Sequence, residues 1–171
     1  MFDLAGRTAL VTGAGQGVGA GIARALARQG AAVAVNDLVE ERAAQTVQAI
    51  ADAGGRAVAA AFDVTDYEAV RRGVEAAEAA LGPVAILINN AGVPPGMQVQ
   101  MFRDSQPADW RKYVELNVYG VMNCSRAVIE GMCARGFGRI VTISSGAGTV
   151  GLAFGVAVSR PPRPRSDRSR S

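Results

Sequence analysis

The residues best suited to chemistry form a glycine-rich run near the N-terminus, Thr12-Gly13-Ala14-Gly15-Gln16-Gly17-Val18-Gly19. The run joins a short apolar segment, expected to be a strand, to an amphipathic segment, expected to be a helix. Glycines permit a tight turn and let the backbone approach a pyrophosphate, and a helix N-terminus offers free N–H groups and the positive end of its dipole. The dinucleotide fingerprint is met only in its relaxed form, Gly15-x-Gly17-x-x-Ala20, so a plain tight turn is the alternative interpretation.

An acidic residue, Asp37, ends the next expected strand, 18 residues after Gly19. A carboxylate at that place can accept both hydrogen bonds from an adenosine ribose, and it repels the 2′-phosphate of NADP. No basic residue lies in the glycine run or directly after Asp37, at Leu38. The pattern therefore favours NAD over NADP. The alternative is that Asp37 only caps the following helix.

Short apolar runs alternate with longer amphipathic ones along the chain, and these elements must position the glycine run and Asp37. The expected strands are 8–11, 32–35, 58–62, 84–88 and 139–143, and the expected helices are 20–29, 40–53, 66–80 and about 109–134. This alternation predicts βαβ units in a Rossmann-type, doubly wound parallel sheet with helices on both faces, a three-layer α/β fold. The strand segments are continuously apolar, as buried parallel strands are.

The amino-acid composition limits which classes of protein and of functional site are possible. The chain has 171 residues, of which 49% are hydrophobic and 19% charged, which suits one packed domain. Because it has no His, His-based nucleophile triads and His-ligated metal sites are excluded. Cys124 and Cys133 lack the close spacing of zinc or redox motifs, so we expect no metal site and no disulfide, and two buried or half-buried thiols in a reducing compartment.

The basic charge is concentrated at the C-terminus. Residues 160–171 contain five Arg and one Asp, a net +4, which leaves −1 for residues 1–159 out of the total of +3. Residues 159–171 contain no aliphatic or aromatic side chain, so we expect a disordered tail after a domain at 1–158. A nucleic-acid partner is not expected, although the tail as a nucleic-acid tether is an alternative. No secretory signal or membrane span is evident, which favours the cytoplasm.

Five motifs in order make residues 4–157 resemble the short-chain dehydrogenase/reductase family. They are the glycine motif at Thr12, Gly13, Gly17 and Gly19, Asp63 after the third strand, Asn89-Asn90-Ala91-Gly92 after the fourth, Asn117 in the long helix, and Ser145 after the fifth. The resemblance implies NAD-linked hydride transfer between an alcohol and a ketone. It implies cofactor contacts from Gly13, Gly17, Val18, Gly19, Asp37, Asp63, Val64, Asn90 and Gly92.

The resemblance also implies two catalytic residues. Ser145 would hydrogen-bond a substrate carbonyl or hydroxyl, and Asn117 would hold a water-mediated proton path. The alternative for Ser145 is a strand cap. For the Asn89-Asn90 pair, which belongs to the expected cofactor wall, the alternative is an ordinary turn. Asn117 is unfavourable in mid-helix by propensity, which favours a special role.

The family's catalytic Tyr and Lys are missing from their expected positions, which hold Val158 and Pro162. Valine has no exchangeable proton, and losing a positioned acid/base typically costs about 10²–10⁴-fold in rate. We therefore expect negligible turnover. The resemblance suggests that the chain is truncated or frameshifted before the family's Tyr-x-x-x-Lys. We also expect the sheet to be incomplete at its C-terminal edge. The fifth strand would then be an exposed apolar edge of the sheet. The family forms homo-oligomers, but we do not expect this chain to form the same assembly. The alternative function is a non-catalytic NAD-binding module.

Overall fold

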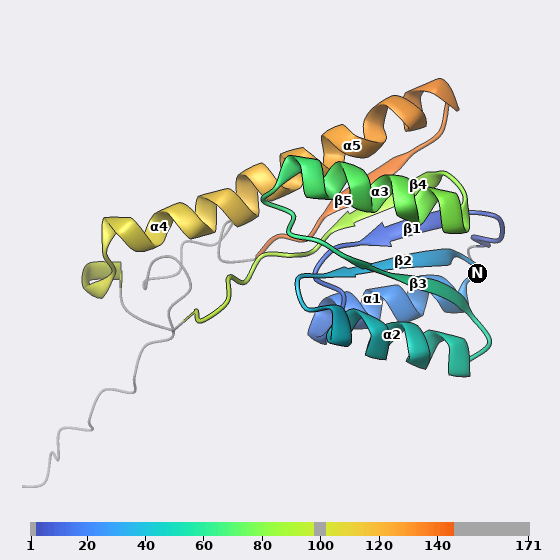
Figure 1. Cartoon of the computed structure of the whole chain (residues 1–171), viewed down its shortest axis with the longest axis horizontal. Helices are drawn as coiled ribbons and strands as arrows, with labels where there is room; N and C mark the ends of the chain where they lie inside the picture. The colour runs from blue at the N-terminus through green and yellow to red at the C-terminus, as the bar shows by residue number, and fades with distance from the viewer. Residues whose placement is uncertain (1–2, 98–101, 146–171) are drawn as a thin grey trace, which may run out of the picture.

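The computed structural model describes residues 3–97 and 102–145, which form a three-layer α/β arrangement (Figure 1). The middle layer is a parallel sheet in the order β3-β2-β1-β4-β5. The strands are β1 (Thr8–Val11), β2 (Ala32–Asp37), β3 (Arg56–Ala61), β4 (Val84–Asn89) and β5 (Arg139–Thr142). The chain runs outward from β1 to β3 and then crosses back to β4, so the strand order reverses between β1 and β4. The predicted doubly wound sheet is confirmed.

Helices cover both faces of the sheet. In Figure 1, α1 (Gly17–Arg28) and α2 (Glu40–Asp52) lie on one face, and α3 (Tyr67–Leu81) and α5 (Gly120–Ala134) lie on the other. A short 3-10 turn η1 (Phe102–Asp104), α4 (Pro107–Val114) and a π-helical segment η2 (Glu115–Tyr119) lead into α5.

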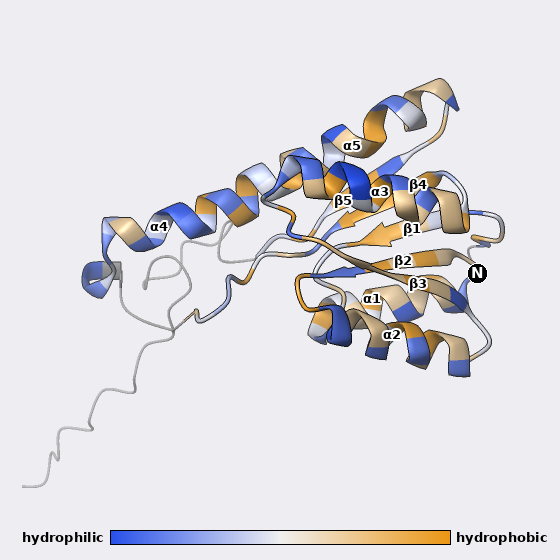
Figure 2. Ribbon diagram, in the orientation of Figure 1, coloured by the Kyte–Doolittle hydropathy of each residue, from blue (hydrophilic) through white to orange (hydrophobic). Residues whose placement is uncertain are grey.

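Successive residues of the central strands supply two separate cores. Leu10 packs with Val70, Leu87 and Cys124 on the α3/α5 side, whereas its neighbour Val11 packs on the α1/α2 side. This alternation follows from the pleat, which points adjacent side chains to opposite faces. Figure 2 shows β1 and β4 as hydrophobic strands between helices whose outer faces carry many hydrophilic residues.

The expectation of strands buried on both faces is confirmed for β1, β2 and β4, whose residues are all buried. It is wrong for β3, which is mostly exposed or half-buried, and for β5, whose four residues are all exposed. These two strands lie at the edges of the described sheet, where fewer elements cover them. The predicted exposed apolar edge at β5 is therefore present among the described residues.

Several boundaries differ from the sequence-based expectation. The second and fourth strands continue through Asp37 and Asn89, because their polar ends still pair with the neighbouring strands. The single long helix expected from about 109 to 134 is instead divided by η2. The expected cap at Asp66 is confirmed, since its carboxylate accepts hydrogen bonds from the N–H groups of Glu68 and Ala69.

Both cysteines are free thiols, but only Cys124 is buried. The expectation of two buried or half-buried thiols is wrong for Cys133, because the last turns of α5 present that side chain to solvent. None of the helices in the described ranges has the length and apolar character needed to cross a membrane. The expected tail at 159–171 and the domain limit at 158 lie outside the described residues.

Candidate functional site

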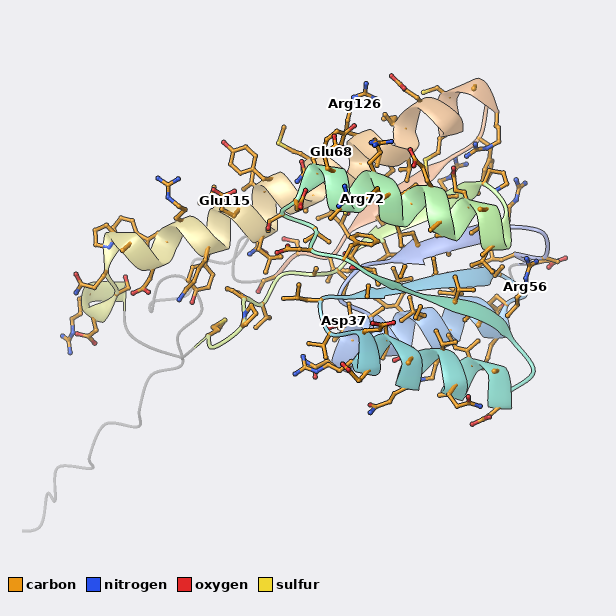
Figure 3. All side chains as sticks on the ribbon, in the orientation of Figure 1. Asp37, Arg56, Glu68, Arg72, Glu115 and Arg126 are labelled. Carbon is orange, nitrogen blue, oxygen red and sulfur yellow. The ribbon has the colours of Figure 1, made fainter. Side chains whose placement is uncertain are left out.

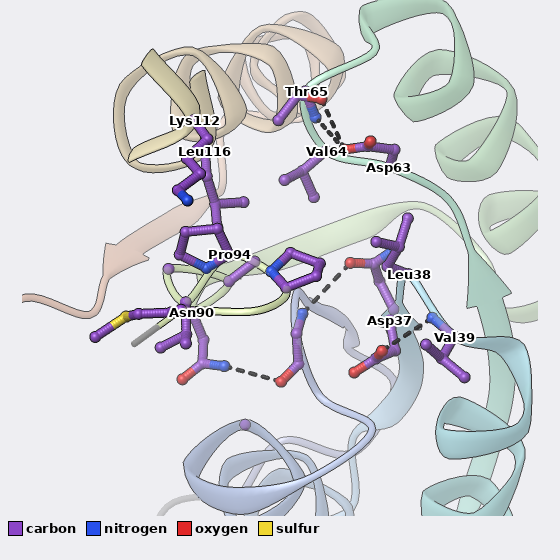
Figure 4. Close-up of a pocket in the computed structure, with 18 of the residues that line it drawn as sticks. Asp37, Leu38, Val39, Asp63, Val64, Thr65, Asn90, Pro94, Lys112 and Leu116 are labelled. Atoms are coloured by element: carbon purple, nitrogen blue, oxygen red, sulfur yellow. Dashed lines mark hydrogen bonds between the residues drawn. The ribbon is translucent and has the colours of Figure 1, made fainter. Parts of the chain in front are cut away.

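A pocket of about 1060 Å³ opens where the strand order reverses, beyond the carboxyl ends of β1, β2, β3 and β4 (Figure 4). Ligands of doubly wound sheets bind at this place. All nine cofactor-contact residues predicted from the sequence line it: Gly13, Gly17, Val18, Gly19, Asp37, Asp63, Val64, Asn90 and Gly92. The fold therefore brings together residues that are far apart in the chain.

The glycine loop that leads into α1 has a conformation that requires glycine. Gly13 and Gly17 have φ values of 59° and 56°, in the left-handed region that side chains disfavour. A Cβ on Gly19 would meet the carbonyl oxygen of Gly13 and lie 2.5 Å from Nδ2 of Asn90. Helix α1 has no acidic residue in its first turn and no side-chain cap from Gln16, so its positive end faces the pocket without a counter-charge of its own.

The carboxylate of Asp37 joins the end of β2 to the glycine loop. Its Oδ2 accepts a hydrogen bond of 3.0 Å from the N–H of Gly15, and its Oδ1 accepts one of 3.0 Å from the N–H of Val39. The alternative, that Asp37 only caps the following helix, is wrong: the N-cap of α2 is Val39, without a side-chain hydrogen bond, and Asp37 instead holds the turn before the helix. A carboxylate can accept about four hydrogen bonds, so its oxygens also have lone pairs for a ligand in the pocket that Asp37 lines.

The loop after β4 is fixed to the loop after β1 by a set of short hydrogen bonds. Oγ1 of Thr12 accepts from the N–H groups of Asn90 (3.0 Å) and Ala91 (3.1 Å). In return, Nδ2 of Asn90 donates to the carbonyl oxygens of Thr12 (2.9 Å) and Gly13 (3.0 Å). The amide group of Asn90 therefore holds the glycine loop in place while the residue lines the pocket (Figure 4).

Asn36 is a positioning residue that the sequence analysis missed. Its side chain is 1% exposed, and Nδ2 donates to the carbonyl oxygens of Ala60 and Phe62, each at 2.9 Å. Its Oδ1 accepts from the N–H of Gly13 at 3.4 Å. It thereby connects β2, β3 and the glycine loop. The available signal was a polar residue next to Asp37 at the end of an otherwise apolar strand.

The loop after β3 contributes an ordered acidic residue. Oδ1 of Asp63 accepts hydrogen bonds from the N–H and Oγ1 of Thr65, at 2.9 and 2.8 Å. Nδ2 of Asn123, on α5, holds the same loop from behind through the carbonyl oxygens of Val64 and Thr65. Asp63 and Val64 are thus presented to the pocket by a fixed turn (Figure 4).

Asn117 lies in η2 and contacts the pocket wall without lining the pocket itself. Its Nδ2 donates to the carbonyl oxygens of Gly92 and Tyr113, both at 3.1 Å. In a regular α-helix the Tyr113 carbonyl would pair with the backbone N–H of Asn117. The side-chain bond competes with that pairing, and the next turn widens to an i→i−5 bond from Gly120 to Glu115. Such π-bulges occur frequently at functional sites.

The other residues singled out in the sequence differ in whether they line the pocket. Ser145 follows β5 at the same edge of the sheet, is exposed, and is not among the residues that line the pocket. Val158 and Pro162 lie outside the described residues. Lys112, the chain's single lysine, lines the pocket from α4, with Nζ 3.3 Å from Oδ1 of Asp109. Arg42 also lines the pocket, which the sequence analysis did not anticipate.

Comparison with a family model identifies the class of protein. The model described as short chain dehydrogenase matches residues 7–159. The chain belongs to this family of oxidoreductases, and the resemblance found in the sequence is confirmed.

Individual relatives agree with this assignment. Gluconate 5-dehydrogenase of Gluconobacter oxydans is 41% identical over 145 residues, which are 85% of this chain and 56% of that enzyme. Cis-4-hydroxycyclohexanecarboxylate dehydrogenase of Sinomonas cyclohexanicum is 40% identical over 147 residues, 86% of this chain and 58% of that enzyme. The chain thus spans little more than half the length of these relatives.

Solved structures share the same architecture. A gluconate 5-dehydrogenase from Burkholderia cenocepacia in complex with NADP and tartrate superposes with a TM-score of 0.76 at 41% identity, covering 84% of this chain and 55% of that one. A 7α-hydroxysteroid dehydrogenase complexed with NADH and 7-oxo glycochenodeoxycholic acid gives 0.79 at 38% identity, covering 86% and 56%.

Proposed function

We propose that the pocket binds a nicotinamide dinucleotide, with NAD as the preferred coenzyme. The observation that carries this proposal is the gathering of the glycine loop, Asp37, Asp63 and the Asn89–Gly92 turn around one pocket at the strand-order reversal. Related structures hold NADP in one case and NADH in another, so membership of the family leaves the choice between the two open. The preference for NAD rests on Asp37.

The residues present fit such a coenzyme. The glycine loop packs so closely against Asn90 that it leaves no room for a Cβ at Gly19. The positive end of α1 faces the pocket beside this loop, which suits a pyrophosphate. Asp37 would accept hydrogen bonds from the adenosine ribose. Asp63 and Val64 would border the adenine. Asn90 and Gly92 would form the wall further along the cofactor.

Within the family's reaction, the bound coenzyme supplies or accepts a hydride. The chain's own contribution would come from Ser145, which can donate a hydrogen bond to a substrate oxygen, and from Asn117. Because the side-chain amide of Asn117 bonds to the carbonyl oxygens of Gly92 and Tyr113, it fixes the helix against the pocket wall. The proposed substrate is a small-molecule alcohol or ketone.

We propose that this chain turns over little or no substrate. The positions of the family's Tyr and Lys hold Val158 and Pro162, neither of which can exchange a proton with a substrate. The loss of a positioned acid/base alone is worth about 10²–10⁴-fold in rate. A non-catalytic dinucleotide-binding module is the second candidate, favoured because the adenosine end of the pocket is fully built from described residues. A cytoplasmic location is likewise a proposal.

A calorimetric titration of the purified chain with NADH tests the binding proposal. We expect saturable binding and a raised melting temperature in the presence of coenzyme. Gly19→Ala should abolish binding, because its Cβ meets Gly13 and Asn90, whereas Gly21→Ala is a matched control with open space around it. No heat with NADH or NADPH would overturn the proposal.

A turnover assay with NAD and simple secondary alcohols then tests the proposed lack of activity. Binding without turnover supports the non-catalytic module. Turnover at an ordinary enzymatic rate would contradict the proposed inactivity and would require an acid/base other than the residues at 158 and 162.

A further inference from the structure

A second cavity lies between α1 and α2, which are side by side on one face of the sheet (Figure 1). Its volume is about 310 Å³, at the lower end of the roughly 300–1,000 Å³ that small-molecule sites occupy. The last turns of both helices and the turns that follow them line it. The pocket at the strand-order reversal lies at the other end of α1, and the two cavities share no lining residue.

Two arginines of α1, Arg24 and Arg28, line the second cavity. They are four residues apart, so both side chains lie on the same face of the helix. Both are exposed, and among the described residues neither guanidinium takes part in a salt bridge or a side-chain hydrogen bond. None of the described lining residues is acidic. Asp52, which precedes the lining residue Ala53, accepts a hydrogen bond of 2.7 Å from Gln48 instead.

The pair of arginines is unfavourable for the helix by itself. Like charges at positions i and i+4 repel each other and destabilise a helix. Arg28 lies in the last turn of α1, where a cation interacts favourably with the helix dipole. This effect falls off within the last turn, so it does not account for Arg24, one turn earlier. An anion bound between the two guanidiniums would remove the repulsion.

The floor of the cavity is apolar and closely packed. Ile50 is 1% exposed and belongs to the core on this side of the sheet, and Ala27 packs against that core. A Cβ built on Gly55 would lie 2.7 Å from Cγ2 of Ile50 and 3.3 Å from Cβ of Ala27. The turn after α2 therefore closes this side of the cavity tightly. The cavity combines a fixed apolar surface with two exposed guanidiniums.

We propose that this cavity is a second binding site, which takes a small phosphate monoester with an apolar substituent. A phosphate monoester has a charge of about −1.5 to −2 at neutral pH and three terminal oxygens. It therefore matches two guanidiniums, each of which can donate two parallel hydrogen bonds. A carboxylate, with one charge and two oxygens, matches only one. The apolar substituent would rest on Ala27 and Ile50. Because the two cavities share no residue, this proposal stands apart from the coenzyme proposal.

Phenyl phosphate is a probe with this chemistry, and NMR titration of the full chain follows its binding residue by residue. We expect saturable shifts of the backbone amides of residues 24–30 and 49–55. Inorganic phosphate should bind more weakly there, and phenol at the same concentration should not bind. Arg24→Ala and Arg28→Ala should each raise the dissociation constant of phenyl phosphate by about tenfold or more, because each removes charge-assisted hydrogen bonds. The amide spectrum of each variant shows whether it is folded.

Arg72→Ala is the matched control. It removes the same charge from an exposed site on α3, across the sheet from α1 and α2 (Figure 3), and should leave the dissociation constant unchanged. The glycine loop also offers N–H groups to a phosphate, so the position of the shifts decides which site is occupied. The proposal is overturned if phenyl phosphate shifts no amide or only those of residues 13–19. It is equally overturned if Arg24→Ala and Arg28→Ala bind as the wild-type chain does, or if Arg72→Ala weakens binding as much as they do.

Discussion

Oδ2 of Asp37 lies 3.0 Å from the amide nitrogen of Gly15, so a residue that lines the pocket, where we propose that the ribose binds, also holds the glycine loop. The same carboxylate accepts from the N–H of Val39, where the chain turns into α2. The proposed ligand contact and the loop geometry would therefore depend on one side chain, which is 7% exposed.

Asp37→Ala should destabilise the fold as well as weaken coenzyme binding. It leaves the N–H groups of Gly15 and Val39 without their acceptor, which should lower the free energy of unfolding by about 1–3 kcal/mol. Asp37→Asn keeps one acceptor oxygen and should have an intermediate effect. Denaturant unfolding of both variants measures this, with the exposed Asp52→Asn as control. Equal stability of Asp37→Ala and the wild-type chain would show that the bonds contribute little.

Thr12→Val should separate the two loops that Thr12 joins. Valine has nearly the same shape but cannot accept from the N–H groups of Asn90 and Ala91. Because Thr12 is 2% exposed, water cannot replace the hydroxyl, and the loss should be about 2 kcal/mol. Thr12→Ser keeps the oxygen and should retain most of the stability. If thermal unfolding shows the two variants to be alike, the hydroxyl has no such role.

The two thiols should differ in reactivity. Burial raises the pKa of the Cys124 thiol to about 12, whereas Cys133 is exposed. Because the thiolate is the reactive form, a chromogenic thiol reagent should modify one cysteine in the folded chain and both after denaturation. Cys133→Ser should leave no thiol that reacts rapidly in the folded state. Rapid modification of that variant without denaturant would mean that Cys124 is accessible.

The same burial makes stability depend on pH. The folded chain keeps the Cys124 proton to higher pH than the unfolded chain, in which the pKa is near the ordinary value of 9.0. The contribution of this group is therefore intact below pH 9.0 and is lost as the pH rises toward 12. Cys124→Ala should flatten the fall in the free energy of unfolding over this window. If the free energy of unfolding of the variant falls equally steeply with rising pH, then groups other than Cys124 cause the fall.

The exposed edge strand should promote self-association of the chain. Ile140 and Val141 of β5 are 37% and 45% exposed, and a strand edge can pair with another chain. Val141→Lys should slow aggregation on warming, measured by light scattering. Ile129→Lys, which places the same charge on an exposed apolar site of α5, is the control. Slower aggregation in both variants alike would attribute the effect to net charge.

Local patterns in the sequence determined much of this protein. Short apolar runs that end in glycine or polar residues predicted the five strands, and the glycine run between a strand and a helix predicted the position of the pocket. Asp37, Asp63 and Asn90 could be placed at one edge of the sheet because each follows a strand, and parallel strands present their carboxyl ends together. These inferences need only the periodicity of neighbouring residues and the rules of βαβ connection.

Only the tertiary structure decided the contacts between distant residues. Helix α2 brings Arg42 back against Gly15, the fold pairs Asn36 with the carbonyl oxygens of β3 and its following loop, and Gly92 draws the side chain of Asn117 out of a regular helix. It also decided that Cys133 faces solvent. Each of these depends on which surfaces meet across the folded chain, and no local sequence pattern contains that information.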